Sequence, residues 1–373
     1  MTTSDTSPEP VPEVETTPEP EPVPAGTDAA SAATVPAGET VIALAEKRRR
    51  RRKLALLFFL FGMLSLFLLI GGAYLLTRKP ITELPIIPDI SGEKLPHYVF
   101  SIYGPSEPIG VAVSPSGDRM YVTETAGDRV VRVYDGRGNP IGTLKPPKTA
   151  GPTHIPVYVA LDPENGDVYV SDRLTMSIYV YSKDGAYRRT FQPKGNLAAT
   201  WQPLGLAFDS QANLYVTDVG ASVHRVLVLG RDGVLKRTFG SPGEFSFPNG
   251  IAVDAAGNLY VSDSNNGRLV VLDASGKLIG SIRRGQGNGD LGLPRGVVID
   301  DSDRLYVVDT IAQRIQLYRI TDREARVPKF IGAFGEEGTL DGQFEYPNGI
   351  AADTRARVYV TDRVNNRVQV WSY

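Results

Sequence analysis

The residue types best suited to catalysis and metal binding are scarce in this chain. It has three histidines, at positions 97, 154 and 224, and no cysteine. Without cysteine there is no disulfide, thiolate zinc site, iron–sulfur cluster, thiol nucleophile or lipidated cysteine. The histidines are too widely scattered for a triad of metal ligands, and no spacing indicates a Ser/His/Asp arrangement or a G-x-S-x-G elbow. We therefore expect no cofactor, with calcium or zinc as alternatives that the residues do not support.

Carboxylates, in contrast, recur at a fixed place. Each of six Tyr-Val-like segments carries an acid three residues after its tyrosine. A ring of six facing carboxylates would bind a cation, but residues that repeat six times are most simply structural, because one site needs them only once. An acid at a strand end can accept N–H groups of the next turn, and an arginine that begins the following strand can pair with it. The acids are Glu124, Asp172, Asp218, Asp263, Asp309 and Asp362, and the arginines are Arg129, Arg225, Arg268, Arg314 and Arg367.

These residues belong to a unit that occurs six times. Each copy has a proline, an apolar run, a turn, a Tyr-Val strand, an alternating third strand and a fourth strand after a Gly-containing turn. We expect the tyrosines to pack between the copies. Four strands at a spacing of 45 to 53 residues predict an all-β, six-bladed propeller of four-stranded antiparallel blades. The prolines that open the copies are Pro108, Pro156, Pro203, Pro248, Pro294 and Pro347.

The two ends of this region predict how the ring closes. The last copy stops at Tyr373 after its third strand, and an isolated fourth strand lies at 97–104, before the first copy. We expect this N-terminal strand to complete the last blade. Such closure removes exposed strand edges and joins both ends of the domain without a disulfide.

The repeat resembles that of a known family. The pattern G-x-F-x-x-P-x-G-I-A-V-D…LYVSD…N-x-R-V-x-V is similar to the NHL repeat of six-bladed propellers, and 243–254 and 342–351 carry it almost letter for letter. The first two blades depart most, since Glu124 replaces Asp and Tyr158 replaces Gly. The resemblance implies a bacterial type of protein with the propeller outside a single membrane segment. Some eukaryotic relatives bind RNA on a basic face, which a net charge of −2 disfavours.

Function is expected where the copies differ. The residue after each repeat proline opens strand one at the mouth of the central channel, and it is apolar in the first three blades and polar in the last three. One apolar wall with converging polar groups is typical of a small-molecule or peptide site, and arginine suits a carboxylate. Aromatic side chains in the loops of the same face suit a protein or glycan partner, and a tryptophan buried under its own loop is an equal alternative. The predicted ligand-binding residues are Asn249, Arg295, Asn348, His154, Tyr158 and Trp201.

The resemblance also carries an enzymatic alternative. NHL relatives include a zinc-dependent lyase whose histidine ligands stand next to the strand-one proline, and lactonase-like propellers hold calcium with Asn, Asp and Glu in the channel. No histidine occupies those positions here, and Asn249 and Asn348 have no acid at an equivalent place. A metal-dependent lyase or a lactonase-like hydrolase therefore stays the alternative to a binding module.

The segment before the propeller is typical of a membrane anchor. Residues 54–77 contain no charge, and as a helix they would extend about 36 Å, enough to cross a bilayer core of about 30 Å. Seven basic residues at 47–53 precede them and two follow, which places the N-terminus in the cytoplasm and the propeller outside. A cleaved signal peptide is disfavoured because the apolar stretch is too long and no A-x-A-like site follows.

The prediction is thus a single-pass membrane protein that displays an extracytoplasmic NHL-type propeller at 97–373 as a sensor or scaffold. An acidic, Pro/Glu-rich tail at 1–46 is expected to be disordered and cytoplasmic, and 78–96 forms a stalk. The expected partners are the membrane, through 54–77, and an unknown protein, peptide or glycan at the propeller face. No nucleic acid is expected.

Overall fold

The chain is described by a computed structural model covering residues 50, 53–66, 68–69, 94–148, 151, 153–220, 223–285, 287–321 and 327–373. It separates into two compact units, Met1–Pro88 and Asp89–Tyr373. The predicted tail at 1–46, residues 67 and 70–77 of the predicted membrane segment and 78–93 of the stalk lie outside the described residues.

The first unit contains one described helical stretch. Residues 53–66 and 68–69 are helical, and their large apolar side chains, such as Leu57 and Phe58, are exposed. Within the described residues, no helix combines the length and the apolar character needed to cross a membrane.

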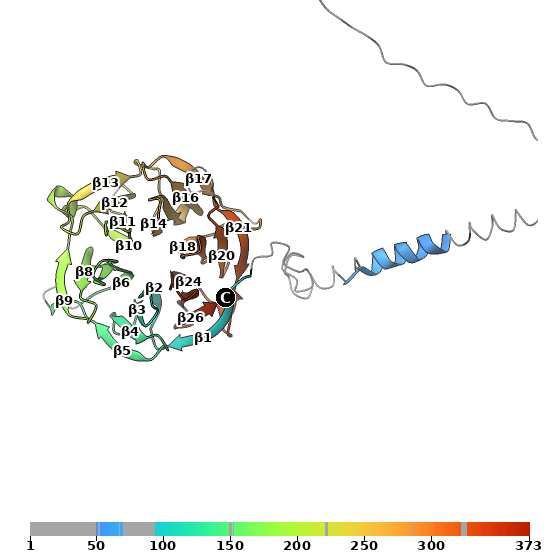
Figure 1. Cartoon of the computed structure of the whole chain (residues 1–373), viewed down its shortest axis with the longest axis horizontal. Coiled ribbons are helices and arrows are strands. Elements are labelled where there is room, and N and C mark those ends of the chain that lie inside the picture. Colours follow the sequence, from blue (N-terminus) through green and yellow to red (C-terminus); the bar gives the residue numbers. More distant parts are fainter. Residues whose placement is uncertain are drawn as a thin grey trace, which may run out of the picture. The chain divides into compact units, whose positions relative to one another are not determined.

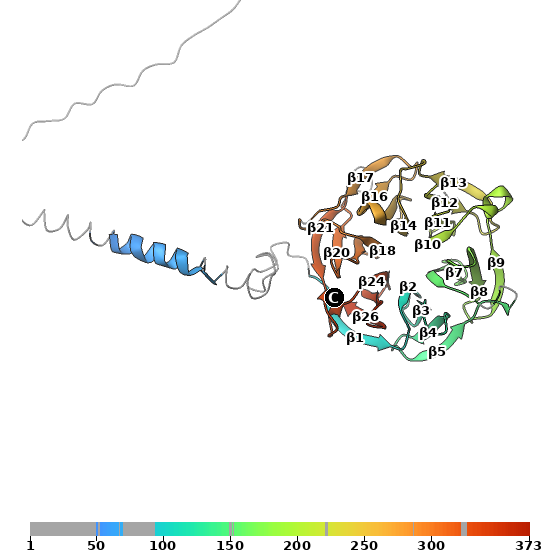
Figure 2. The same cartoon turned by 180° about the vertical axis from the view of Figure 1, so that it is seen from behind.

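The second unit is a ring of six four-stranded antiparallel sheets around a central channel (Figure 1; Figure 2 shows it from behind). In each blade the first strand lines the channel and the fourth lies at the rim. The prediction of an all-β, six-bladed propeller is confirmed. The first strands are mostly apolar and buried because both of their faces are covered, whereas the fourth strands are largely exposed to solvent.

The strand bounds follow the repeat closely. Blades 1 to 3 are β2 (Pro108–Val113), β3 (Arg119–Glu124), β4 (Val131–Asp135), β5 (Pro140–Leu144); β6 (Pro156–Leu161), β7 (Val168–Asp172), β8 (Ser177–Tyr181), β9 (Tyr187–Phe191); and β10 (Pro203–Phe208), β11 (Leu214–Asp218), β12 (Arg225–Leu229), β13 (Leu235–Phe239). Blades 4 and 5 are β14 (Pro248–Val253), β15 (Leu259–Asp263), β16 (Arg268–Leu272), β17 (Leu278–Ile282); and β18 (Pro294–Ile299), β19 (Arg304–Asp309), β20 (Arg314–Arg319), β21 (Lys329–Phe334). Blade 6 contains β24 (Pro347–Ala352), β25 (Arg357–Asp362) and β26 (Arg367–Ser372), and short elements in the loops are η3 (Gly195–Ala199), η4 (Ser264–Asn266), β22 (Glu336–Glu337) and β23 (Gln343–Phe344).

The N-terminal strand closes the ring as predicted. β1 (His97–Tyr103) pairs antiparallel with β26, with Tyr98 opposite Trp371 and Tyr103 opposite Arg367. The order of strands in the last sheet is β1-β26-β25-β24, so the first and last strands of the propeller lie side by side. The edge of β26 is therefore covered, and both ends of the domain are held by one ladder of backbone hydrogen bonds.

The hydrophobic core lies mainly between neighbouring blades. One cluster joins Tyr169 and Val180 of blade 2 to Leu214 and Leu227 of blade 3, and all four are almost completely inaccessible to solvent. The other strand-two tyrosines are buried in the same way, which confirms that they pack between the copies. Burial of each such side chain contributes about 2 kcal/mol to the free energy of folding.

The acids at the ends of the second strands accept hydrogen bonds from the backbone of the adjoining loops. Asp172 Oδ1 accepts the backbone N–H groups of Leu174 and Thr175 at 3.0 and 2.9 Å, as predicted. Asp218 Oδ1 also accepts the N–H of Gln202, in the loop that enters its own blade, at 2.7 Å. These carboxylates therefore fix two loops at once.

Arginine pairing with these acids is confirmed in three blades. Arg225 Nε lies 2.9 Å from Asp218 Oδ2, and the pairs in blades 4 and 6 measure 2.7 Å. In blade 1 the prediction that Arg129 pairs with Glu124 was wrong. Glu124 is paired with Arg132, whose Nε lies 2.6 Å away, because the side chain two residues into β4 lies on the same sheet face as Glu124.

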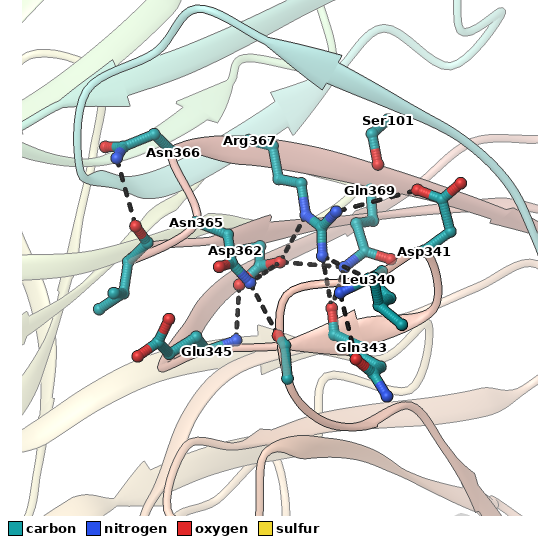
Figure 3. A network of polar contacts seen from close by, with 12 residues as sticks. Ser101, Leu340, Asp341, Gln343, Glu345, Asp362, Asn365, Asn366, Arg367 and Gln369 are labelled. Carbon is teal, nitrogen blue, oxygen red and sulfur yellow. Dashed lines mark hydrogen bonds and ion pairs between the residues drawn. The ribbon is translucent and has the colours of Figure 1, made fainter.

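The most buried of these pairs lies where the ring closes (Figure 3). The side chains of Arg367 and Asp362 are 2% and 0% exposed. Arg367 also donates to the carbonyl oxygens of Leu340 and Gln343, both at 2.8 Å. It therefore holds the long loop that enters blade 6 against the strand that β1 covers.

Candidate functional site

The channel has two ends with different chemistry, and each is named here after the connections around it. The loop face carries the connections from strand two to strand three and from strand four to the next blade. The turn face carries the turns between strands one and two and between strands three and four. The residues predicted from the sequence to line the mouth begin the first strands and therefore lie at the loop face.

The apolar half of the mouth is a small buried cluster. Val157 and Leu204 pack with Tyr158, and Ile109 and Phe247 pack against them. These residues come from blades 1 to 4. The expected apolar wall is therefore present, but its members contact one another and leave little surface open.

The polar half is connected to this cluster by one hydroxyl group. Tyr158 Oη, from blade 2, donates to Asn348 Oδ1 of blade 6 at 3.2 Å and reaches Asn249 Oδ1 of blade 4 at 3.5 Å. Arg295 Nη1, from blade 5, donates to the same oxygen of Asn249 at 2.9 Å. Four of the six predicted residues thus meet at the channel axis.

Tyr158 is the side chain that closes this end. It occupies a position that is glycine in the other five blades. A Cβ added at Gly205 of blade 3 would lie 1.9 Å from Asn249 O, and one added at Gly349 of blade 6 would lie 2.2 Å from Ile109 O. The inner strands approach each other closely at these glycines. The tyrosine is 8% exposed, and this burial raises its pKa to about 12 although the charge of Arg295 acts in the opposite direction.

Asn249 and Arg295 differ in how fully their polar groups are used. The amide nitrogen of Asn249 donates to Phe247 O at 3.2 Å and to Ser264 Oγ at 2.8 Å, so this side chain is fully bonded inside the protein. Arg295 is partly exposed, its Nε is buried without a hydrogen-bond partner, and it forms no ion pair with any described residue. A guanidinium group in such surroundings is suited to bind a carboxylate or another planar anion.

His154 and Trp201 lie away from this group. His154 Nδ1 lies 3.2 Å from Asp172 Oδ2, and its Nε2 lies 3.0 Å from Gly151 O. Trp201 is 1% exposed and packs in the core between blades 2 and 3, with its ring 6.5 Å from that of Phe191. Both side chains are buried beneath the loop face, and the structure does not bring them to the channel mouth.

The turn-face end contains a cavity that sequence reasoning missed. Its volume is about 800 Å³, which is within the usual range for ligand sites. Its wall is formed by the second halves of all six inner strands, which are apolar throughout: residues 111–113, 159–161, 206–208, 251–253, 297–299 and 350–352. Tyr158 lies at the loop-face end of the channel, and the cavity lies on the turn-face side of it.

The cavity also extends outward between blades 1 and 2. Ser114, Asp118 and Arg119 line it on one side, and Asp162 and Lys183 line it on the other. Its position coincides with a departure from the repeat. Ser114 stands where the other five copies have aspartate, so this single serine was the sequence signal for the asymmetry.

The aspartates at this position bond to the strand-two tyrosines in blades 3 to 6. Asp254 Oδ2 accepts Tyr260 Oη at 3.2 Å, for example, and Asp300 Oδ2 accepts Tyr306 Oη at 2.9 Å. In blade 1 the hydroxyl of Tyr121 instead donates to Lys183 O of blade 2 at 3.2 Å. The missing carboxylate therefore redirects a tyrosine toward the neighbouring blade.

Candidate metal ligands do not gather at either end. The described part of the chain holds no group of three or more His, Asp or Glu side chains arranged to bind a metal ion. His224 Nδ1 accepts the backbone N–H of Phe247 at 3.0 Å, His154 is bound to Asp172, and His97 lies on the rim strand β1. The recurring acids are engaged by loop N–H groups and arginines.

These features define a six-bladed β-propeller with a stoppered channel. Two segments, 245–272 in blade 4 and 344–371 in blade 6, match the NHL repeat. The chain therefore contains NHL repeats, in agreement with the resemblance read from the sequence.

Two curated relatives with NHL repeats match more than half of the chain. The chain is 27% identical over 223 residues to NHL repeat-containing protein 3 of Homo sapiens and 28% identical over 218 residues to its counterpart of Mus musculus. Each match covers 57% of this chain and 50% of the relative. The chain thus spans about half the length of the curated relatives it matches.

Solved structures share the fold at low sequence identity. A streptogramin B lyase aligns with a TM-score of 0.54 and 14% identity over 73% of this chain and 96% of its own. A protein of unknown function from Bacteroides thetaiotaomicron VPI-5482 aligns with a TM-score of 0.56 and 15% identity over 75% of this chain and 72% of its own. At such identities the likeness concerns the fold alone.

Proposed function

We propose that this chain is a single-pass membrane protein whose extracytoplasmic NHL propeller binds a protein or peptide through its loop face, as a sensor or scaffold. The observation that carries the binding proposal is Arg295, a partly buried cation at the channel mouth with no carboxylate partner among the described residues. Removing a charge from water is costly unless an opposite charge or good hydrogen bonds compensate. A carboxylate of the partner would supply both.

Exposed apolar side chains on the same face support a peptide or protein partner. Ile311, Tyr346 and Val364 are 58%, 53% and 45% exposed, and they lie in adjoining loops of blades 5 and 6. The backbone N–H of Tyr346 donates to Gln313 Oε1 and that of Val364 to Glu345 O, which holds the loops together. Exposed apolar groups on the same face as an unpaired cation favour a partner with both an acidic group and apolar side chains.

The membrane part of the proposal rests on the sequence and on the first unit. The described helical residues expose large apolar side chains in every direction, such as Leu57, Phe58 and Leu68. A helix that is apolar all round is stable only when it is covered by protein or lipid. The basic residues at 47–53 support a cytoplasmic N-terminus.

A peptide experiment tests the binding site. The full-length chain in lipid nanodiscs would be screened with a hexapeptide library that has free C-terminal carboxylates and with the same library amidated. We expect Arg295→Gln to weaken the best free-carboxylate peptide at least tenfold, and Arg295→Lys to weaken it less, since lysine keeps the charge but lacks the bidentate fork. Arg173→Gln, which removes an exposed arginine elsewhere on the loop face, is the matched control and should have no effect. Equal binding of free and amidated peptides, or loss in the control, would contradict the assignment.

Topology requires a separate measurement. An amine-reactive reagent that does not cross membranes should label the lysines of the propeller on intact cells, whereas Lys47 should react only after lysis. Labelling of the propeller only after lysis would overturn the extracytoplasmic assignment without affecting the carboxylate site.

An enzyme with a metal in the channel is the alternative function. No arrangement of the described residues favours it, since no histidine or acid joins Asn249 and Asn348 at the mouth. We therefore propose no cofactor. Stoichiometric zinc or calcium in elemental analysis of the purified chain, together with turnover of a lactone, would support the enzyme instead.

A further inference from the structure

We propose that a pocket between blades 3 and 4 on the turn face binds a small carboxylate that carries hydroxyl groups, with the size and chemistry of a uronic acid. The pocket has a volume of about 370 Å³, which is within the range of small-molecule sites. It lies on the opposite face of the propeller from Arg295, so this site is independent of the proposed loop-face function.

The pocket is open because an arginine that fills the neighbouring junction is absent. The junction of blades 2 and 3 and that of blades 3 and 4 are equivalent, since Arg189 donates to Arg231 O in the first and Arg237 to Ala274 O in the second. The guanidinium of Arg231 occupies its junction and contacts two carboxylates of blade 2. Ala274 lines the pocket with a methyl group only, which leaves the corresponding space free for a ligand.

The same junction has also lost a carboxylate that would pair with a cation. In blade 2 Asp167 Oδ1 lies 3.0 Å from Arg188 Nε. The equivalent residues of blade 3 are Asn213 and Lys236, and Lys236 Nζ donates to the amide oxygen of Asn213. The cation is therefore retained, while its internal anion is replaced by a neutral group.

Two neighbouring cations of β13 face this pocket. Val228 is paired with Arg237 and Leu229 with Leu235, so Lys236 is the extra residue of a β-bulge. A bulge interrupts the alternation of side chains, and Lys236 and Arg237 both line the pocket. Neither forms an ion pair with any residue that the structure describes. Their remaining N–H groups are suited to a carboxylate, which accepts strong charge-assisted hydrogen bonds.

The two acids of the pocket are already occupied. Asp209 Oδ1 accepts the backbone N–H groups of Gln211 and Asn213 at 2.9 and 2.8 Å, and its Oδ2 accepts Asn213 Nδ2 at 2.7 Å. Asp254 accepts the corresponding bonds from its own turn. Both carboxylates therefore serve to form turns and leave little capacity for a ligand that donates, such as an ammonium group.

Neutral polar groups complete the wall and favour hydroxyl groups on the ligand. The exposed side chains of Ser210 and Gln211 line the pocket and form no hydrogen bonds with the described residues. Hydroxyl and amide groups can each donate and accept. Burial raises the pKa of Tyr215, another lining residue, to about 12, so this phenol stays neutral and adds no charge that would repel a carboxylate.

A titration with sugar acids tests the ligand class. The full-length chain in nanodiscs would be titrated with galacturonate, and binding would be followed by saturation-transfer NMR. We expect galacturonate to bind at least tenfold more tightly than galacturonamide or galactose, which keep the hydroxyl groups but lack the negative charge. Digalacturonate, measured alongside, distinguishes the end of an acidic glycan from a free sugar acid, according to which of the two binds more tightly. Equal binding of galacturonate and galacturonamide, or no saturable binding of either acid, would overturn the ligand assignment.

Two variants and a control test the location. Ala274→Arg copies the filled junction, where Arg231 shows that an arginine is accommodated, and it should abolish binding without lowering the melting temperature. Lys236→Gln should weaken binding of galacturonate about tenfold. Lys277→Gln, which removes an exposed lysine from the same turn as Ala274 but outside the pocket, should have no effect. Binding that persists in folded Ala274→Arg, or that Lys236→Gln and Lys277→Gln weaken equally, would overturn the pocket as the site.

Discussion

The two ends of the central channel are built from the same six strands and nevertheless differ in almost every property. At the loop face Tyr158, Asn249 and Asn348 meet at the axis and close the passage. At the turn face the same strands leave a cavity of about 800 Å³. Tyr158 stands in place of glycine at the loop-face end, and Ser114 stands in place of aspartate where the cavity extends between blades 1 and 2.

Residues that recur in every blade and residues that occur once have different roles in this repeat protein. The residues that recur in the blades, such as the strand-two tyrosines and the acids that follow them, are engaged in packing and loop contacts. Both single departures lie in blades 1 and 2. A site that occurs once therefore arises where the symmetry is broken and the recurring contacts can no longer be made.

The ion pairs of the two faces differ in burial, and removing the more buried pair should cause the largest loss of stability. Asp362 and Arg367 on the loop face are 0% and 2% exposed, whereas Asp353 and Arg357 on the turn face are 0% and 18% exposed. Arg367→Ala leaves Asp362 buried without its cation and should lower the free energy of unfolding by about 3–5 kcal/mol. Denaturant unfolding of the full-length chain, followed by tryptophan fluorescence, measures this loss.

The neighbouring pair provides the control. Arg363 and Glu107 are 41% and 46% exposed, so Arg363→Ala should cost only about 0–1 kcal/mol. Equal losses for the two variants would mean that burial does not distinguish the ring-closing pair from a surface pair.

Substitution of a glycine in the inner ring of strands should cause the next largest loss of stability. A Cβ at Gly205 would lie 1.9 Å from Asn249 O, so Gly205→Ala forces blades 3 and 4 apart and should cost about 1–3 kcal/mol. Gly142, on the rim strand β5, has nothing within 4 Å of such a Cβ. Gly142→Ala should therefore leave the melting temperature nearly unchanged, and a similar drop in both variants would contradict close packing of the inner ring.

The smallest expected effect is a loss of stability at low pH when Asp353, on the turn face, is protonated. Burial alone would raise the pKa of Asp353, but hydrogen bonds from Arg357 and Tyr359 and the charge of Arg357 outweigh it and place the pKa below the usual 3.8. A lowered pKa in the folded state stabilises the protein above about pH 4, and this contribution is lost as the pH falls through the folded pKa. The difference in melting temperature between the unmodified chain and Asp353→Asn should be constant from pH 7 to 5 and shrink below pH 4. A difference that does not change with pH would exclude the carboxylate as its source.

Much of the propeller follows from the sequence because its signals are local and repeated. Six copies of the proline, Tyr-Val and acid pattern specify strand type and number, and the isolated strand at 97–104 before the first copy predicts the pairing of β1 with the last blade. At the mouth, Asn249, Arg295, Asn348 and Tyr158 were identified because they differ between copies. The loop positions of His154 and Trp201 predict exposed aromatic side chains, but both side chains are buried, because burial beneath a loop depends on contacts that no local pattern expresses.

Blade number, strand order and ring closure are thus properties of the amino-acid sequence, because they depend on periodic apolar residues and on partners at a fixed separation along the chain. The open end of the channel and the identity of its stopper depend on the folded ring. Asn249 and Asn348 follow Tyr158 by 91 and 190 residues in the chain. The three side chains meet only because six twisted sheets direct their first strands at one axis. In the same way, Asp162 Oδ2 is buried without a hydrogen-bond partner while Tyr169 Oη is bonded by Arg189 and Asp162 Oδ1 by Arg231, an arrangement that no spacing in the chain expresses.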